Sequence, residues 1–390
     1  MDQSTIAARM RSLSALGSRI SLIERSHLGE FSWPFADTMR KTAETLLVER
    51  QIDGEFKPIV HVIAEGMDYQ IVDDETPPTG KRRILIVAFP RQLKHHVLLH
   101  AIFGHELAHP AINAQKPGLI VRTSVMPILT ERILRDETQV LEWLKRDDAP
   151  LSVRNDPALR THTFPASAVK NWRIEIVCDL FGLLLFGPGF AAAHRTIIEA
   201  LSTDPLAFDL RTSTHPPYPI RQRIISTAIR LLGWSAPITN PGDGLAHTAE
   251  KKMLEYVTGG PEGDWFALLT DDQVGRILQH LTRIFEASPS LAFVRPDRDI
   301  LLELISRLTL GRPPIAQSLD ENGVAANKSV PTSHCLYAGW SFWFGRDQLQ
   351  DEMRRHVPTL KTLSFLEINR LCDHAMLQQC AIDIAARGNL

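Results

Sequence analysis

Residues 105–109 of the chain read His-Glu-Leu-Ala-His, with three residues between the two histidines. On an α-helix, side chains four positions apart lie on the same face, so two imidazoles at this spacing converge on one metal ion. Glu106 falls beside the pair, where its carboxylate can take a proton from a water molecule. The stretch predicts a helix that carries a zinc centre, with His105 and His109 as ligands and Glu106 as general base.

A second stretch supplies a third ligand. Residues 172–182 read Trp-Arg-Ile-Glu-Ile-Val-Cys-Asp-Leu-Phe-Gly, with Glu175 and Asp179 one helical turn apart among apolar neighbours. Catalytic zinc takes three protein ligands and keeps one position open. Burying two carboxylates is costly unless a cation or strong donors compensate them. Zinc would compensate Glu175, and an imidazole N–H would compensate Asp179. The alternative is that both acids pair with arginines in a structural network.

The third element is residues 214–221, Thr-His-Pro-Pro-Tyr-Pro-Ile-Arg. The prolines fix an extended turn before the next helix and hold the flanking polar residues in defined places. Acyl transfer passes through an oxyanion that a cation or a phenol can stabilise, so His215, Tyr218 and Arg221 are candidate donors. The alternative is a capping turn with an exposed arginine.

Weaker signals receive structural interpretations. Helical geometry places His96 and His100 on the face opposite His105 and His109, so we expect them to be surface or packing residues. The spacing of Cys372, His374 and Cys380 fits no common metal motif. The aromatic residues among positions 340–344 are expected to pack the C-terminal helices onto the rest of the protein.

The composition excludes several classes of protein. The 390 residues are 44% hydrophobic and 23% charged, which is typical of a globular chain. A formal charge of −2 gives no basic field, so no nucleic-acid partner is expected. Four cysteines without a Cys-x-x-Cys pair indicate free thiols in a reducing compartment. The N-terminus lacks signal-peptide features, and the most apolar stretch, 180–193, is shorter than the roughly 20 residues of a spanning helix. We therefore expect a cytoplasmic protein without a membrane span.

Periodicity predicts an α+β fold that is mostly helical. Two apolar runs, 58–72 and 81–90, predict a β-hairpin, and Pro90 is expected to open a helix that ends at Pro110. Other helices are expected in the regions 1–50 (two, broken near 29–34), 129–145, 169–186, from the prolines of 216–219 to about 234, 245–310 and 360–387. Residues 237–244 are expected to form a linker, and 318–333 a polar loop.

The three motifs, in this order, resemble those of gluzincin zinc metallopeptidases of the HtpX-like and CAAX prenyl-protease-like type. The resemblance covers roughly residues 58–235 and rests on HELAH, EIVCD and THPP followed by an arginine. It implies zinc on His105, His109 and Glu175, Glu106 as general base and Asp179 as partner of a ligand histidine. His215 would lie close to the metal, and Arg221 would brace the site. Cys178 stands where the family usually has alanine; its thiol either only packs or also tunes the site, and we favour packing.

The resemblance also implies an architecture. A zincin-like catalytic domain over 58–235 would carry a small antiparallel sheet packed on the motif helix. Helices of residues 1–57 would precede it, and a helical region of residues 236–390 would follow and regulate access or bind a protein partner. The strand near 84–89 would hold a substrate backbone by strand addition.

The predicted function is hydrolysis of peptide bonds in a restricted set of proteins or peptides, with Zn²⁺ as cofactor. Glu106 would accept the proton of the attacking water and return it to the leaving amine. Two alternatives stay open at this point. One is a zinc-binding sensor or scaffold without essential hydrolysis, although a structural zinc site has no need of Glu106. The other is a metallohydrolase that acts on a non-peptide amide.

Overall fold

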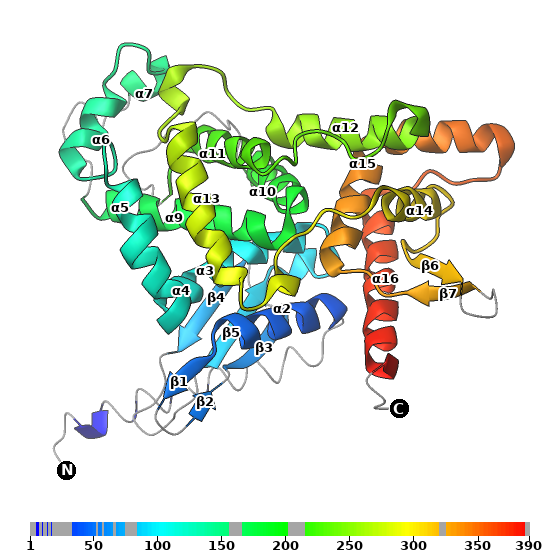
Figure 1. Ribbon diagram of the computed structural model, residues 1–390, viewed down its shortest axis with the longest axis horizontal. Helices are drawn as coiled ribbons and strands as arrows, with labels where there is room; N and C mark the ends of the chain where they lie inside the picture. The colour runs from blue at the N-terminus through cyan, green and yellow to red at the C-terminus, as the bar shows by residue number, and fades with distance from the viewer. Residues whose placement is uncertain are drawn as a thin grey trace.

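A computed structural model describes residues 33–51, 54–56, 58–64, 68–74, 84–155, 166–201, 215–319 and 325–386, with isolated residues before position 33. Helices dominate this part of the chain, and three small sheets accompany them (Figure 1). The expected α+β, mostly helical class is confirmed at this level. Of the two helices expected in 1–50, the first lies largely outside the described residues, and the second is α2 (Trp33–Leu46).

The largest sheet has three strands, β3 (Ile59–Ala64), β4 (Gln70–Asp74) and β5 (Ile84–Phe89), in the order β3-β5-β4. β4 runs antiparallel to β5, but β3 runs parallel to it. The predicted hairpin pairing is confirmed for β4 and β5, but the prediction that the whole sheet is antiparallel is wrong, because β3 joins it in parallel. Every residue of the run Ile84–Phe89 is apolar. Because β5 is the central strand of the sheet, all of these residues but the first are buried. A separate hairpin joins β1 (Glu49–Gln51) and β2 (Gly54–Phe56).

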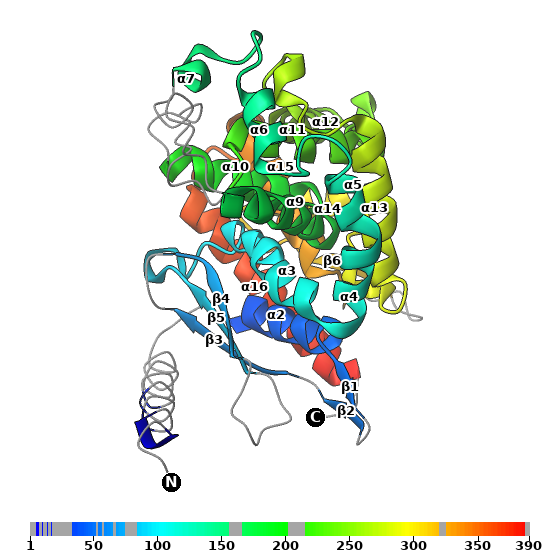
Figure 2. The ribbon, with the colours of Figure 1, turned by 90° about the vertical axis from the view of Figure 1, so that its left-hand side faces the viewer.

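The place of β5 also corrects an expected role. Because β5 pairs with a strand on each side, it has no free edge to which a substrate backbone could add. The prediction that this strand binds substrate is therefore wrong. The edge strand that packs against α3 (Phe103–Asn113) is β4. Figure 2 shows α2 and α3 on the same side of this sheet.

The motif helix α3 begins later and ends later than the sequence predicts. Residues between Pro90 and α3 form two short 3₁₀ turns, η1 (Arg91–Leu93) and η2 (Leu99–Ile102). Pro110 lies inside α3, which ends only at Asn113. A proline removes only its own N–H, and Ala111 and Ile112 after it are buried. One lost hydrogen bond therefore does not end the helix.

The chain after α3 is broken into short elements: α4 (Gln115–Ile120), a π turn η3 (Val121–Val125), α5 (Met126–Leu129), α6 (Glu137–Leu144) and α7 (Leu151–Arg154). The single helix expected over 129–145 is therefore wrong in its first half. The physical reason is a new helix start at Asp136, whose carboxylate accepts a hydrogen bond from the Gln139 N–H at 3.0 Å.

The centre of the molecule is α9 (Ala166–Phe186), which confirms the apolar helix expected at 169–186. Such a helix, apolar on every side, requires neighbours all round. It has them in α3, α10 (Pro188–Leu201), α11 (Tyr218–Leu231) and α13 (Asp271–Phe285). No helix within the described ranges is both long and apolar enough to span a membrane.

The C-terminal half is helical, as expected, with one correction. Its longer helices are α12 (Leu245–Thr258), α13, α14 (Arg298–Thr309), α15 (Thr332–His356) and α16 (Phe365–Ala386); its 3₁₀ turns are η4 (Pro241–Asp243), η5 (Asp264–Phe266) and η6 (Pro289–Leu291). The polar loop predicted at 318–333 instead contributes to a hairpin of β6 (Ala316–Leu319) and β7 (Ala325–Lys328), because Ala316 is buried and holds this strand against the body.

Buried hydrogen bonds hold the C-terminal half against the rest and fix the segment that leads into it. The buried Trp340 indole of α15 donates a hydrogen bond to the Leu98 carbonyl at 3.2 Å, which confirms the expected packing of the aromatic cluster. The segment expected as a linker is held by the buried Glu250, which accepts the backbone N–H groups of Ile238 and Thr239, each at 3.0 Å. One apolar core runs from α2 to α16. The functional division at residue 235 stays a prediction.

Candidate metal centre

Two glycines bring α3 and α9 into close contact. A Cβ atom on Gly104 would lie 2.8 Å from the Gly182 Cα, and a Cβ on Gly182 would lie 2.9 Å from the His105 backbone nitrogen. Any larger residue at either position would push the helices apart. This close crossing places the histidines of α3 opposite the acids of α9.

Glu175 lies between the imidazoles of α3. Its Oε2 atom is 3.0 Å from His105 Nε2, and its Oε1 atom is 3.8 Å from His109 Nε2. Oε2 is buried, yet it has no hydrogen-bond partner with suitable geometry among the described residues. A buried carboxylate oxygen that faces imidazole nitrogens without a hydrogen bond fits a ligand of a metal ion. The residues predicted as ligands are therefore brought together.

His215 joins this group from the loop before α11. Its Nε2 atom lies 3.1 Å from Glu175 Oε2, and half of its side chain, 51%, is exposed. His105, Glu175 and His215 each place one donor atom within 4.8 Å of the other two. The sequence predicted His215 beside the metal as an oxyanion donor, and the structure places it beside the Glu175 carboxylate.

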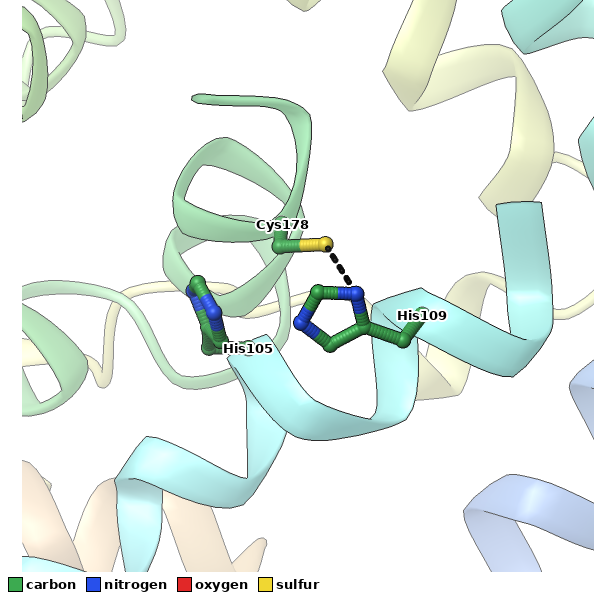
Figure 3. Close-up of side chains that lie close together, drawn as sticks. All are labelled: His105, His109 and Cys178. Atoms are coloured by element: carbon green, nitrogen blue, oxygen red, sulfur yellow. Dashed lines mark hydrogen bonds between the residues drawn. The ribbon is translucent and has the colours of Figure 1, made fainter. Parts of the chain in front are cut away.

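A second set of three donors within 4.8 Å consists of His105, His109 and Cys178. Figure 3 shows the Cys178 sulfur directed at the His109 ring, with 3.6 Å between Sγ and Nδ1. Cys178 is buried. The sequence analysis favoured packing over a role in the site for Cys178, because a single cysteine has no spacing motif to mark it. In the predicted set of ligands, Glu175 faces His105 with its Oε2 atom and His109 with its Oε1 atom.

Asp179 orients His105 from the other side of the ring. Its Oδ1 atom lies 2.8 Å from His105 Nδ1, so Nε2 is left to face Glu175. The Arg221 guanidinium donates two further hydrogen bonds to Asp179, at 2.6 and 2.7 Å. Asp179 is thus held by the predicted imidazole and also by an arginine, as the alternative interpretation proposed. Glu175 has no arginine among its described ion-pair partners.

The charges of this network depend on one another. Burial raises the pKa of the Asp179 carboxyl, but the Arg221 guanidinium outweighs burial and holds that pKa well below its usual range. Burial lowers the pKa of His105, but the hydrogen bond to Asp179 and the neighbouring Glu175 carboxylate outweigh it and raise that pKa to about 9. Burial raises the pKa of the Glu175 carboxyl, and the His105 and His215 imidazoles reverse the shift. The Asp179 and Glu175 carboxyls are therefore both ionised, Asp179 beside the Arg221 guanidinium and Glu175 beside the His105 imidazole.

Glu106 is half-buried beside the candidate ligands. Its side chain lines a cavity of about 400 Å³ together with His105 and His215. Burial is the largest influence on its pKa, which lies above the usual value for a glutamate. A carboxylate with a raised pKa holds a proton more readily than an exposed one, which suits a general base. Glu106 belongs to neither set of three donors, which leaves its carboxylate for proton transfer.

Two other site residues differ from the sequence interpretation. Tyr218 directs its hydroxyl at Gln222 Oε1, 3.5 Å away, so the structure does not bring this phenol to the carboxylates. Arg221 is buried and uses its N–H groups on Asp179, so it braces the network rather than facing an oxyanion. The predicted donor roles of Tyr218 and Arg221 are not supported by these contacts, whereas the bracing role of Arg221 is.

Three further histidines, described next, belong to neither set of converging donors. His194 of α10 lines the cavity, and its Nε2 atom lies 3.7 Å from Asp179 Oδ1. Burial and the nearby Arg221 lower the pKa of His194 to about 3, so it is neutral. No motif spacing in the sequence pointed to it. His100 is buried with its Nδ1 atom 3.2 Å from the Tyr69 hydroxyl, and His96 packs beside Phe365, which confirms their structural roles.

No family model, curated protein or solved structure matches the chain. The assignment of a function therefore rests on the geometry of these residues.

Proposed function

We propose that the chain is a zinc-dependent endopeptidase of the gluzincin type, in which Glu106 is the general base. The observation that supports this most strongly is the convergence of two imidazole nitrogens on the buried Glu175 Oε2 atom, which lies 3.0 Å from His105 Nε2 and 3.1 Å from His215 Nε2. Two histidines and a glutamate are a donor set that catalytic zinc uses. The order of the three sequence motifs supports the same family.

A zinc ion held by His105, His109 and Glu175 supplies a Lewis acid that polarises a carbonyl and lowers the pKa of water. Glu106 accepts the proton of the water whose oxygen attacks the carbonyl carbon. It returns this proton to the amine nitrogen as the C–N bond breaks. The half-exposed His215 donates a hydrogen bond to the oxyanion from beside Glu175. Asp179 accepts the His105 Nδ1–H and so leaves Nε2 as the atom that would bind the ion.

The substrate backbone is expected to lie along β4. This strand forms an edge of the sheet, packs against α3 and begins directly after Tyr69, which lines the cavity. An extended peptide that pairs with β4 passes in front of α3 and Glu106. Partners are therefore proteins or peptides that present an extended segment.

Zinc-dependent cleavage tests the proposal. The purified chain is expected to contain about one zinc ion and to create new N-termini in a library of peptides from a digested proteome. A chelator should abolish cleavage, and added zinc should restore it. His109→Ala and Glu175→Ala should each lose the metal, as measured by elemental mass spectrometry, because two ligands hold zinc poorly.

The outcome also separates the alternatives. Zinc in the wild type without any new N-terminus would favour a sensor or scaffold, or a hydrolase of non-peptide amides. Zinc retained in Glu175→Ala would show that another donor, such as His215 or Cys178, completes the site.

A further inference from the structure

Cys178 and Asp179 are consecutive residues of α9, and each contacts the Nδ1 atom of one histidine in α3. Asp179 Oδ1 lies 2.8 Å from His105 Nδ1, and Cys178 Sγ lies 3.6 Å from His109 Nδ1. The two histidines are one helical turn apart, so neighbouring positions of α9 reach successive turns of α3. Both imidazoles therefore have a contact of the same kind on the same ring nitrogen.

The other nitrogen of each ring faces Glu175. His105 Nε2 lies 3.0 Å from Glu175 Oε2, and His109 Nε2 lies 3.8 Å from Glu175 Oε1. Figure 3 shows His109 Nε2 on the side of the ring that faces His105, away from the Cys178 sulfur. An imidazole that binds an ion through Nε2 carries its proton on Nδ1, and this N–H needs an acceptor. The Asp179 carboxylate is that acceptor for His105, and the Cys178 sulfur lies in the corresponding place at His109.

The contact at His109 has no substitute in the part of the chain that the structure describes. There, the Cys178 sulfur is the only hydrogen-bond partner of His109 Nδ1. Cys178 is fully buried and lies one helical turn before Gly182, where α3 and α9 cross closely. A short side chain such as cysteine can reach Nδ1 from this position without separating the helices.

The competing role for Cys178 is that of a metal ligand, because its sulfur also converges with donor atoms of His105 and His109. Two contacts favour positioning over ligation. Asp179 occupies His105 Nδ1, so His105 offers an ion only Nε2, on the side of Glu175. The Cys178 sulfur instead contacts Nδ1 of His109, the nitrogen that does not face Glu175.

We infer that Cys178 is a positioning residue that orients His109 for zinc, as Asp179 orients His105. The inference rests on the proposed metal centre and goes beyond it. The family that the sequence resembles usually has alanine at this position, and an alanine side chain cannot accept an N–H. The thiol is therefore a feature of this chain's own site.

Replacement of the thiol tests the inference through zinc affinity, measured by competition with a chelator of known affinity. Cys178→Ala is expected to weaken zinc binding about tenfold, at the lower end of the roughly 10–100-fold that such partners contribute. The effect is modest because sulfur is a weak acceptor and the His109 side chain, 35% exposed, can donate to water instead. Cys178→Ser should bind zinc at least about threefold more tightly than Cys178→Ala, because a hydroxyl also accepts an N–H.

A matched control is Cys335→Ala in α15. Cys335 is equally buried, and its sulfur contacts only the Pro314 carbonyl among the described residues. Both alanine variants remove a buried sulfur, so both lose packing, but only Cys178→Ala should lose zinc affinity. Equal zinc affinity of Cys178→Ala and the wild type would overturn the inference. A serine variant no better than the alanine variant, or an equal loss in Cys335→Ala, would attribute the effect to packing and overturn it too.

Cobalt substitution separates positioning from ligation. The Co²⁺-loaded wild type is expected to show no sulfur-to-cobalt charge-transfer absorption, because the thiol faces His109 Nδ1 rather than the ion. Such a band, lost in Cys178→Ala, would show that Cys178 is itself a ligand and would overturn the inference.

The same measurements distinguish failure of the inference from failure of the proposed function. A wild type that binds neither metal would contradict the metal centre, and the role of Cys178 with it. A wild type that binds zinc but cleaves no peptide would contradict the peptidase alone. The expected order of zinc affinities, with wild type above Cys178→Ser and Cys178→Ser above Cys178→Ala, would then still support the positioning role.

Discussion

Glu106→Gln is expected to lower the rate of peptide cleavage by about a thousandfold while the chain retains its zinc. Glutamine has nearly the same shape as glutamate but cannot accept the proton of the attacking water. Glu106 belongs to neither set of converging donors, so its replacement leaves His105, His109 and Glu175 in place. The Glu106 side chain lines the cavity together with His105 and His215.

The measurement combines the cleavage rate of the best peptide from the library with the zinc content of the same samples. Glu286→Gln, an exposed glutamate at the end of α13, is the matched control and should retain both. A Glu106→Gln variant that keeps cleavage within about threefold of wild type would remove Glu106 from the role of general base. A variant without turnover that still supports the biological role would favour the sensor alternative.

The sequence was sufficient to predict which side chains share a face of a helix and which buried acids need partners. Four residues separate His105 from His109, and helix geometry alone places their rings on one face. Two acids within the apolar run of α9 required partners, because burying unpaired carboxylates is costly. The structure supplies them as His105, His215 and Arg221. A histidine partner for Asp179 therefore followed from pattern and energetics together, whereas the brace from Arg221 was implied only by the family resemblance.

The arrangement of the strands was not predictable in the same way. The apolar run of β5 identified a strand, but the order β3-β5-β4 depends on which strand enters the centre of the sheet. The helix boundaries expected at Pro90 and Pro110 were also wrong. At Pro110, the tertiary burial of Ala111 and Ile112 outweighs the local effect of the proline. Secondary-structure propensity describes one segment at a time, whereas strand order and helix ends depend on contacts between segments.

Residues that act through a single tertiary contact left no signal. Cys178 and His194 stand in helices among apolar residues, and neither has a partner at a motif spacing in the sequence. Their roles come from the crossing of α3 with α9 and from the place of α10 beside the cavity. The glycine pair 104 and 182, which permits that crossing, is visible in the sequence only as two ordinary glycines in helices.

Arg221→Met is expected to destabilise the protein by about 3–5 kcal/mol, the largest stability effect of any change at the site. Arg221 and Asp179 are both buried, and two hydrogen bonds join them. Removing only the cation leaves a buried carboxylate beside two imidazoles, His105 at 2.8 Å and His194 at 3.7 Å, which cannot replace a doubly hydrogen-bonded guanidinium. Urea denaturation measures the loss, and Arg230→Met is the control in the same helix. Arg230 is exposed and should cost less than about 1 kcal/mol.

A double variant separates stability from metal binding. Asp179→Asn combined with Arg221→Met removes both buried charges, so it should regain much of the stability lost in the single variant. Zinc affinity should nevertheless stay about 10–100-fold below wild type, because an amide orients the His105 ring less strongly than a carboxylate does. A double variant with wild-type zinc affinity would show that the Asp179–Arg221 pair serves the fold alone. If stability and affinity fall and recover together, unfolding accounts for both losses, and Asp179 has no separate role in holding His105 toward the ion.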